Sequence, residues 1–346
     1  MMRLPYFRFA SPRSVAEAAD LLAAAPAGQA MLVAGGTDLL PNMKRRQQTP
    51  QTLIGLRRVA ELRQTTNGNG LGIGAGVTLA ELVRDDRVRD RFGALWQAAA
   101  HVATPQLRNM GTIGGNLCLD TRCNYYDQNY EWRKAIDFCM KKDGAVCWVA
   151  TSSPRCLAVS STDTAPALIA LGAEVTLVSA RGARTIPIAD LFRNDGIHYL
   201  TRRPDEILTR VQLPRLDGWR SVYWKLRRRG AFDFPVLSVA AAVKLAGDGA
   251  VESARLVLGA VASRPVEAPQ AAAALIGHAL SDASIARAAE LAAQPARPMD
   301  NTDFTLVWRK RMTRAFVGYA LRELRGEDMR EVQRELGIRD LEFGIR

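Results

Sequence analysis

The sequence predicts an α+β protein built from more than one folding unit. Over the first 217 residues, short apolar runs typical of strands alternate with helical segments. From about Gly218 the pattern changes to long strand-like runs followed by alanine-rich helices, which is typical of a separate α+β domain. At 346 residues the chain is long enough for two or three domains. No motif recurs with the period of a solenoid.

These changes of pattern divide the chain into four segments. We expect a first subdomain over residues 1–57 and a second over residues 58–217. An α+β domain then covers residues 218–325, and a charged tail that docks on the body or frays covers residues 326–346.

The first subdomain is predicted to contain one helix and two short strands. Ser14 and Glu17 have the spacing of a capping box, and an apolar stripe begins at Ala18. "MLVA" (31–34) and "TLIGL" (52–56) have the composition of strands. The first of these strands runs directly into a pair of glycines, so the chain must turn there.

The second subdomain begins with a glycine-rich hairpin. Asn67–Gly68 is predicted as its turn, and Thr78 with Glu81 forms a second capping box. The glycines at 72–76 are spaced G-x-G-x-G, which fails the G-x-G-x-x-G pattern of a Rossmann dinucleotide site. The remaining elements are predicted to be a helix over 92–103, a helix, strand, turn and strand over 165–192, and a strand over 205–214.

Composition and charge exclude several classes of protein. Apolar residues make up 48% of the chain, and no apolar run approaches the roughly 18 residues of a membrane span. The N-terminus shows no signal-peptide pattern, so we expect a cytoplasmic protein without a membrane anchor. The net charge is +12, but the 47 lysines and arginines are scattered and match no nucleic-acid-binding motif. We expect a charged solvent face or contacts with acidic partner surfaces, and no bound nucleic acid.

Two glycine loops are candidates for binding an anion. "LVAGGTDLL" (32–40) and "RNMGTIGGNL" (108–117) each contain consecutive glycines. Glycine allows positive φ and close approach of the backbone, so a row of N–H groups can face a pyrophosphate. Two such loops could hold one diphosphate between two subdomains.

All five cysteines lie within one short part of the chain, between residues 114 and 156. An odd number of cysteines in a cytoplasmic protein is a poor disulfide framework. Four of them read C-x15-C-x7-C-x8-C, without the C-x2-C pairs that structural zinc sites usually show. Four thiolates can bind zinc or an iron-sulfur cluster, and the wide spacing favours the cluster. Zinc and unligated thiols remain alternatives at this point, as does a basic zinc-containing binding module for nucleic acid.

An ordered set of motifs over residues 1 to about 324 resembles the FAD-binding medium subunit of the molybdenum hydroxylase (xanthine dehydrogenase) family. The motifs are "LVAGGTDLL", "HVATPQLRNMGTIGGNL", "SSTDTAPALIALGAEVTLVSARGAR", "DEILTRVQLP" and "YWKLRRRGAFDFPVLSVAAAVKL". The resemblance implies a vanillyl-alcohol-oxidase-type (PCMH-like) domain of two α/β subdomains with FAD between them. It also implies a C-terminal domain with a three-stranded sheet on helices, similar to the C-terminal domain of CO dehydrogenase flavoprotein.

The resemblance assigns FAD contacts position by position. The first glycine loop would bind the diphosphate and adenosine, with Thr112, Gly115 and Asn116 as a second wall. Asp163 would bind the ribityl chain. Val102, Ala103 and Leu208 would lie near the isoalloxazine, with Lys225 at the flavin ring. A helix N-cap is the alternative role for Asp163, and surface charge is the alternative for Lys225. The complete set is Leu32, Val33, Ala34, Gly35, Gly36, Thr37, Asp38, Leu39, Val102, Ala103, Thr112, Gly114, Gly115, Asn116, Asp163, Leu208 and Lys225.

The cysteine segment over residues 120–158 resembles an insertion in this family. In most members the ribityl aspartate follows the second glycine loop closely, whereas here the cysteines lie between Asn116 and Asp163. "CLDTRCNYYDQ" and the segment after it resemble the β subunit of 4-hydroxybenzoyl-CoA reductase. This resemblance implies a 4Fe-4S cluster on Cys123, Cys139, Cys147 and Cys156. Cys118 follows the glycine loop directly and is expected to be a small buried filler near FAD.

The resemblance implies an electron-transfer oxidoreductase subunit with no catalytic residue of its own. Electrons from ferredoxin would pass through the 4Fe-4S cluster and FAD to a 2Fe-2S small subunit and a molybdopterin-containing large subunit. The assembly would be a dimer of heterotrimers that removes a phenolic hydroxyl reductively in anaerobic aromatic degradation. The alternative is the FAD subunit of an oxidative hydroxylase that acts on an aldehyde, purine or N-heterocycle.

Overall fold

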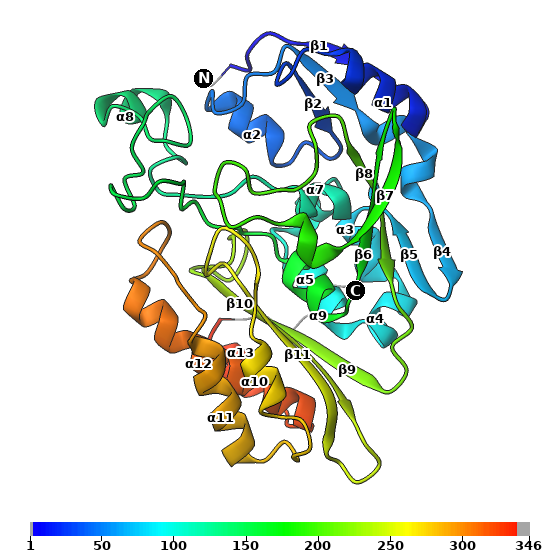
Figure 1. The fold of residues 1–346 in the computed structure, drawn as a ribbon, viewed down its shortest axis with the longest axis vertical. Helices are drawn as coiled ribbons and strands as arrows, with labels where there is room; N and C mark the ends of the chain where they lie inside the picture. The colour runs from blue at the N-terminus through cyan, green and yellow to red at the C-terminus, as the bar shows by residue number, and fades with distance from the viewer. Residues whose placement is uncertain (1–2, 338–346) are drawn as a thin grey trace.

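The computed structural model describes residues 3–337 and contains three β-sheets (Figure 1). A small parallel sheet at the N-terminus and a central antiparallel sheet form the first two-thirds of the chain. An antiparallel C-terminal sheet, with its helices on one face, forms the rest. None of the helices within residues 3–337 is long and apolar enough to cross a bilayer.

The N-terminal sheet has the strand order β1-β3-β2, and all its pairs are parallel. Ser14 caps the first helix as predicted, because its hydroxyl accepts from the Glu17 amide at 3.1 Å. The carboxylate of Glu17 accepts from the amide of Arg13 instead of Ser14, so the predicted capping box forms only in half. The elements are β1 (Arg8–Ala10), α1 (Val15–Ala24), β2 (Ala30–Val33), α2 (Leu39–Lys44), β3 (Thr52–Gly55), and the 3₁₀ turns η1 (Leu56–Arg58) and η2 (Ala60–Arg63).

The central sheet has the order β4-β5-β8-β6-β7, and all its pairs are antiparallel. The predicted capping box of Thr78 and Glu81 is confirmed in both directions. Its elements are β4 (Thr65–Gly68), β5 (Gly70–Gly74), α3 (Leu79–Arg84), α4 (Asp86–Arg91), α5 (Gly93–Ala100), α6 (Pro105–Arg108), α7 (Ile113–Leu117), α9 (Thr164–Ala170), β6 (Glu174–Ser179), β7 (Gly182–Pro187), η3 (Ile188–Leu191) and β8 (Ile207–Leu213).

The predicted position of the glycine-rich hairpin turn is wrong. Asn67 and Gly68 belong to strand β4, and the turn lies at Asn69, between the paired residues Gly68 and Gly70. Gly70 has a φ of 108°, and a Cβ there would lie 1.9 Å from the carbonyl oxygen of Leu213. The close approach of β8 therefore requires glycine at position 70, and this long-range contact places the turn two residues further along the chain.

The C-terminal sheet is buried on both faces because its strands alternate between two cores. Val239, Ala241 and Val243 face the C-terminal helices, whereas Ala240 and Ala242 join the core of the central subdomain. The sheet contains the three predicted strands and adds a fourth of two residues at its edge, in the order β12-β11-β10-β9. Its elements are β9 (Trp219–Leu226), β10 (Leu237–Leu245), β11 (Val251–Gly259), β12 (Val266–Glu267), α10 (Pro269–Ala273), α11 (Asp282–Ala293) and α12 (Leu306–Arg325).

The described part of the tail packs on this domain. It contains α13 (Arg330–Glu335), and Met329 is buried against the core beneath α11 and α12. The last nine residues of the predicted tail, 338–346, lie outside the described residues. The boundaries at residues 57, 217 and 325 stay predictions.

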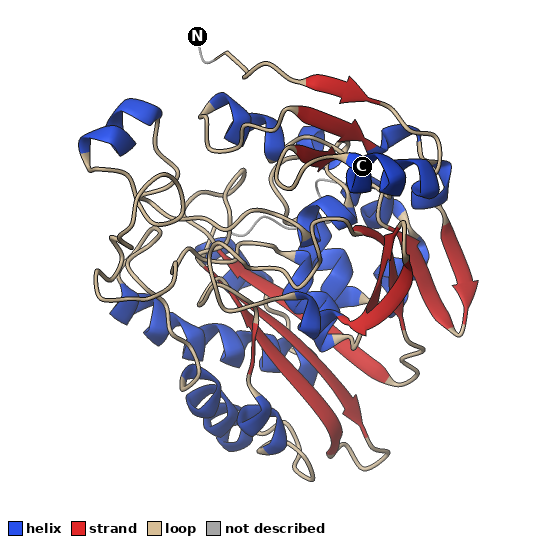
Figure 2. Cartoon of the chain, turned by 45° about the horizontal axis from the view of Figure 1, so that its top comes forward, coloured by secondary structure: helices blue, strands red, loops and turns tan. Residues whose placement is uncertain are grey.

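The cysteine segment leaves the central subdomain and returns to it at a single point. Arg122 and Val159 form a β-bridge with two backbone hydrogen bonds of 2.8 and 2.7 Å. Between them lies one short helix, α8 (Tyr130–Ala135), and otherwise loops, which extend away from the three sheets (Figures 1 and 2). The segment is therefore a side excursion from the fold and not part of any sheet.

Candidate cofactor cavity and cysteine cluster

A cavity of about 510 Å³ opens where the three units of the fold meet. The loop between β2 and α2, the segment from α6 to α7, and strand β8 all contribute walls. The loop between β9 and β10 adds a fourth wall from the C-terminal domain. The volume lies within the range of cofactor and ligand sites, which is about 300–1,000 Å³.

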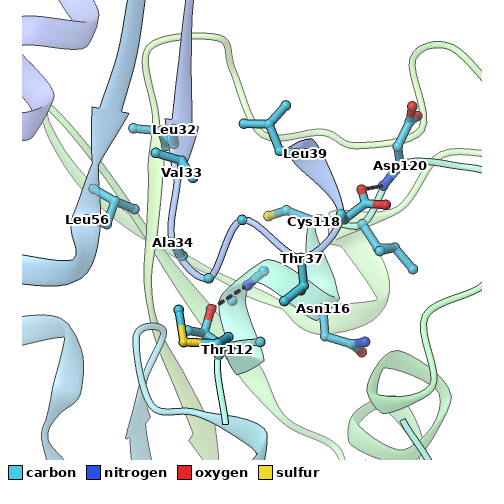
Figure 3. Close-up of a pocket in the computed structure, with 18 of the residues that line it drawn as sticks. Leu32, Val33, Ala34, Thr37, Leu39, Leu56, Thr112, Asn116, Cys118 and Asp120 are labelled. Carbon is cyan, nitrogen blue, oxygen red and sulfur yellow. Dashed lines mark hydrogen bonds between the residues drawn. The ribbon is translucent and has the colours of Figure 1, made fainter. Parts of the chain in front are cut away.

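The two glycine loops predicted from the sequence contact each other at this cavity. A Cβ on Gly35 would lie 1.9 Å from the carbonyl oxygen of Met110, so the first loop packs directly on the second. Gly36 has a φ of 71°, a conformation that glycine adopts without strain. Figure 3 shows Thr37 of the first loop beside Asn116 of the second, with Leu32 and Val33 further up strand β2.

Asn116 joins the second loop to the start of helix α9. Its Oδ1 accepts hydrogen bonds from the Thr162 hydroxyl at 2.8 Å and from the hydroxyl and amide of Thr164 at 2.7 and 3.1 Å. Because Asp163 lies between these two threonines, this contact holds Asp163 in the cavity wall. Thr112 caps helix α7 by accepting from the Gly115 amide at 3.1 Å.

Asp163 occupies the N-cap position of α9, but its side chain makes no capping hydrogen bond. Its carboxylate accepts instead from the Tyr223 hydroxyl at 2.7 Å and from Lys225 Nζ at 3.0 Å. Lys225 also donates to the carbonyl of His101 at 3.0 Å. Burial raises the pKa of Asp163 and lowers that of Lys225, and the contact between them opposes both shifts. The helix-cap alternative for Asp163 is therefore wrong.

The cavity gathers the positions that the family resemblance assigns to FAD, with one exception. Every position in that set except Lys225 lines the cavity. Lys225 is 1% exposed and lies behind Asp163, so it supports the wall and is not part of it. The surface-charge alternative for Lys225 is therefore wrong. As flavin contacts, these positions stay predictions.

Sequence reasoning missed one residue behind the cavity wall and one group of residues that line the cavity. Tyr223 orients Asp163, and Phe232, Asp233 and Phe234 line the cavity from the loop between β9 and β10. The amide of Phe232 donates to the carbonyl of Ala103 at 3.1 Å, which ties this loop to the opposite wall. The available signal was the "GAFDFP" sequence, which places aromatic side chains in a connection between two strands.

Comparison with known families identifies the chain. A family model described as the FAD binding domain in molybdopterin dehydrogenase matches residues 5–216. A second, described as the CO dehydrogenase flavoprotein C-terminal domain, matches residues 221–324. The chain is an FAD-binding medium subunit of the molybdenum hydroxylase family. The predicted α+β fold class is thereby confirmed.

Relatives of this flavoprotein subunit extend over most of its length. The FAD-binding subunit PaoB of an Escherichia coli aldehyde oxidoreductase is 35% identical over 272 residues, which is 75% of this chain and 82% of the relative. The medium subunit of nicotine 6-hydroxylase from Paenarthrobacter nicotinovorans is 30% identical and covers 85% and 88%. Among solved structures, CO dehydrogenase from Oligotropha carboxidovorans matches with a TM-score of 0.78 and 26% identity, covering 94% of this chain and 100% of that one.

Four of the five cysteines of the flavoprotein subunit are gathered in the inserted segment. Cys123, Cys139, Cys147 and Cys156 are each 4–6% exposed, and all are free thiols. Burial, with smaller contributions from the thiols of Cys156 and Cys139, raises the pKa of Cys123 to about 12. Burial likewise raises the pKa of Cys156 to about 11, with added effects from Cys147 and Cys139. The four thiols therefore lie close enough to influence one another.

Backbone groups pack closely on the sulfur of Cys156. The amide of Ala158 donates to Cys156 Sγ at 3.4 Å, the kind of contact that tunes the potential of iron-sulfur clusters. A Cβ on Gly196 would lie 2.6 Å from the same sulfur, so only glycine fits there. Within residues 3–337, no group of three or more histidine, cysteine, aspartate or glutamate side chains is arranged to hold a single metal ion.

Cys118 belongs to the cavity and not to the group of four. It is half-buried at the end of α7 and lines the cavity. This placement agrees with the expected filler position beside the cofactor, although the side chain is less buried than expected. The cavity, with Cys118, is therefore distinct from the group of four cysteines in the inserted segment.

The base of the inserted segment is tied to the first glycine loop by charged contacts. Arg122 forms an ion pair with Asp38, and its Nη1 donates to Asn42 Oδ1 at 3.1 Å. The amide of Asp120 donates to the Asp38 carboxylate at 3.3 Å. Asp38 and Asp120 both line the cavity, so the cysteine segment begins at the cavity wall.

Proposed function

We propose that this chain is the electron-transfer flavoprotein subunit of a molybdenum hydroxylase-type enzyme, with FAD in the cavity between the two glycine loops. The observation that carries this proposal is the convergence of the family's FAD positions on one cavity of suitable size. When bound, FAD supplies the ability to accept two electrons and release them one at a time. The chain would act with a molybdopterin-containing large subunit and a 2Fe-2S small subunit, as a dimer of heterotrimers.

The residues of the cavity suit the parts of this cofactor. Backbone amides at residues 34–37 suit the charge of a diphosphate. The carboxylate of Asp163 can accept hydrogen bonds from ribityl hydroxyls. Lys225 and Tyr223 hold that carboxylate in place, so the role of Lys225 in this proposal is to orient Asp163. In this proposal, the substrate is transformed on the large subunit and not on this chain.

We further propose that Cys123, Cys139, Cys147 and Cys156 bind a 4Fe-4S cluster. Four buried thiols with mutual electrostatic influence, and one amide donor to sulfur, fit the donor set of such a cluster. Val146 and Trp148, each 37% exposed, lie on either side of Cys147, so this edge of the segment is accessible to an electron donor such as ferredoxin.

Two directions of electron flow are candidates, and different observations favour each. The relatives described above are named for an aldehyde oxidoreductase, a nicotine hydroxylase and a CO dehydrogenase, and this favours an oxidative enzyme with electrons leaving through FAD. The inserted cysteine segment favours the reductive direction of 4-hydroxybenzoyl-CoA reductase, in which a strong reductant must be accepted. The family assignment argues against the basic zinc-containing binding module considered from the sequence.

Analysis of anaerobically purified complex tests the cofactors. For each copy of this chain we expect about one FAD, and about four iron and four acid-labile sulfide beyond those of the 2Fe-2S small subunit. Flavin with no iron or sulfide beyond those of the small subunit would contradict the cluster and leave the flavin proposal standing. A complex without flavin would contradict both the cavity assignment and the electron-transfer role.

Stopped-flow reduction of the intact complex tests the direction. In the reductive case, reduced ferredoxin should bleach the flavin band rapidly, and 4-hydroxybenzoyl-CoA should reoxidise it. In the oxidative case, an aldehyde or N-heterocycle should bleach the flavin, and oxygen or NAD should restore it. The direction of electron flow is decided by which compound reduces the flavin and which compound reoxidises it.

A further inference from the structure

Lys141 is a buried lysine of the cysteine segment with all its hydrogen-bonding capacity used. Its side chain is 6% exposed. Nζ donates to Asp120 Oδ1 at 2.8 Å, to Thr121 Oγ1 at 2.7 Å and to the carbonyl oxygen of Gly196 at 2.6 Å. An ammonium group has three donors, so the head of this side chain is fixed in one orientation.

One side of Lys141 faces the cysteine cluster. Gly196, whose carbonyl accepts from Lys141, also donates its amide to the carbonyl of Cys156 at 2.9 Å. The α-carbon of Gly196 packs so closely on Cys156 that a Cβ there would lie 2.6 Å from Sγ. A single residue therefore separates the ammonium from one of the proposed ligand sulfurs.

Lys141 also contacts residues of the flavin cavity. Its carboxylate partner Asp120 lines that cavity, and so does Tyr199. Lys141 Nζ lies 5.5 Å from the centre of the Tyr199 ring and 4.8 Å from that of Tyr126. The Tyr126 hydroxyl donates to the second oxygen of Asp120 at 3.0 Å. Lys141 therefore contacts residues of both proposed cofactor sites.

We infer that Lys141 is a positioning residue that sets the reduction potential of the group held by the four cysteines. This inference depends on the 4Fe-4S proposal above. Adding one electron to the cluster makes it more negative, with no bond formed or broken. A fixed positive charge in a buried, low-dielectric region stabilises that reduced form and raises its potential. Asp120, whose Oδ1 lies 2.8 Å from the ammonium, offsets part of this field.

The test is an EPR-monitored potentiometric titration of the intact complex carrying Lys141→Met, with dithionite as reductant. At a fixed potential we expect at least a tenfold lower ratio of reduced to oxidised cluster, equivalent to about 59 mV for a one-electron couple. Lys141→Arg retains the charge and should recover most of the shift. Lys142→Met is the matched control, because the side chain of Lys142 is 30% exposed and pairs with Asp143. We expect no change in cluster potential for this control.

The outcomes separate this inference from the function on which it rests. Iron and sulfide in the unsubstituted complex that do not exceed those of the 2Fe-2S small subunit would overturn the cluster, and the role of Lys141 with it. An intact cluster whose potential is the same in Lys141→Met would overturn this inference alone. If Lys141→Met loses iron, Asp120→Asn decides instead: the ammonium is then less offset, so the cluster potential should rise, and an unchanged potential would overturn the inference.

Discussion

The flavin cavity and the cysteine segment differ in how the chain builds them. The cavity is made largely of backbone, from loops that are anchored at both ends by strands or helices of three packed units. The cysteine segment has one short helix, and its side chains supply the chemistry. It is joined to the fold by a β-bridge and a few buried charged contacts around Asp120 and Arg122. The two sites should therefore fail independently when mutated.

The largest expected effect is loss of the cluster in Cys147→Ser. A serine oxygen is a poor replacement for a thiolate ligand, so the complex should lose about four iron and four acid-labile sulfide for each copy of this chain and keep those of the 2Fe-2S small subunit. FAD content should stay near normal because Cys147 does not line the cavity. Iron, sulfide and flavin analysis of the purified complex checks this. Cys118→Ser is the matched control and should keep its iron; full iron content in Cys147→Ser would remove that residue from the ligand set.

The converse substitution is Gly36→Val, which should lose FAD and keep iron. Its φ of 71° disfavours a β-branched residue, and a Cβ would lie 3.1 Å from the side chain of Leu40. We expect flavin occupancy to fall at least tenfold, measured by release of FAD from purified protein. Gly28→Val is the control, because Gly28 has a similar φ of 76° but does not line the cavity. Equal flavin loss in both variants would show general misfolding.

Lys225→Met tests how the C-terminal sheet supports Asp163 in the cavity wall. It leaves the buried carboxylate of Asp163 without its cation, which typically costs about 3–5 kcal/mol of stability. Urea unfolding of the purified protein measures this loss, and flavin affinity should fall with it. Lys244→Met on strand β10 removes a half-exposed ion pair with Glu252 and should change stability by less than about 1 kcal/mol. Equal losses in the two variants would contradict the role given to Lys225.

The smallest effect is a pH dependence at the contact of α12 with α5 and β9. Burial raises the pKa of Glu323, while hydrogen bonds from Gln97 and Trp224 oppose this shift. The folded protein therefore holds the proton more tightly than the unfolded chain. The stability this adds is full below the ordinary value of 4.5, and it is lost as pH rises through the raised pKa.

Thermal unfolding as a function of pH checks this effect. Glu323→Gln has no carboxylate to ionise, so its melting temperature relative to the unsubstituted protein should be higher at pH 8 than at pH 4. Glu290→Gln, at an exposed ion pair with Arg314, should show no such difference. A constant offset between Glu323→Gln and the unsubstituted protein at all pH values would contradict the argument.

Local signals in the sequence predicted much of the fold, and long-range contacts account for the errors. Thr78 and Glu81 are three residues apart, so their capping box depends only on neighbours and is found as predicted. The hairpin turn at Gly70 depends on strand β8, which lies far along the chain, and its position was predicted incorrectly. Asn116, in the second glycine loop, was assigned to the FAD site by resemblance. Its hydrogen bonds to Thr162 and Thr164 could be found only in the structure.

The candidate site shows the same limit. The glycine loops could be recognised because glycine itself signals an unusual backbone. The role of Lys225 at the flavin ring stays a prediction. Its burial behind Asp163 required the structure, because residue type alone does not indicate which side of a buried carboxylate a lysine approaches. Phe232 and Phe234 reach the cavity through the fold of a loop that has no periodic pattern.

The bridge between Arg122 and Val159 has a consequence for how such a protein could arise. Since the chain enters and leaves the segment at hydrogen-bonded neighbours, the host fold needs no rearrangement to accommodate the residues between them. A short tight turn could replace them and still connect the same two ends. The segment is therefore compatible with insertion in one step, which leaves the strand pairing of the three sheets unchanged.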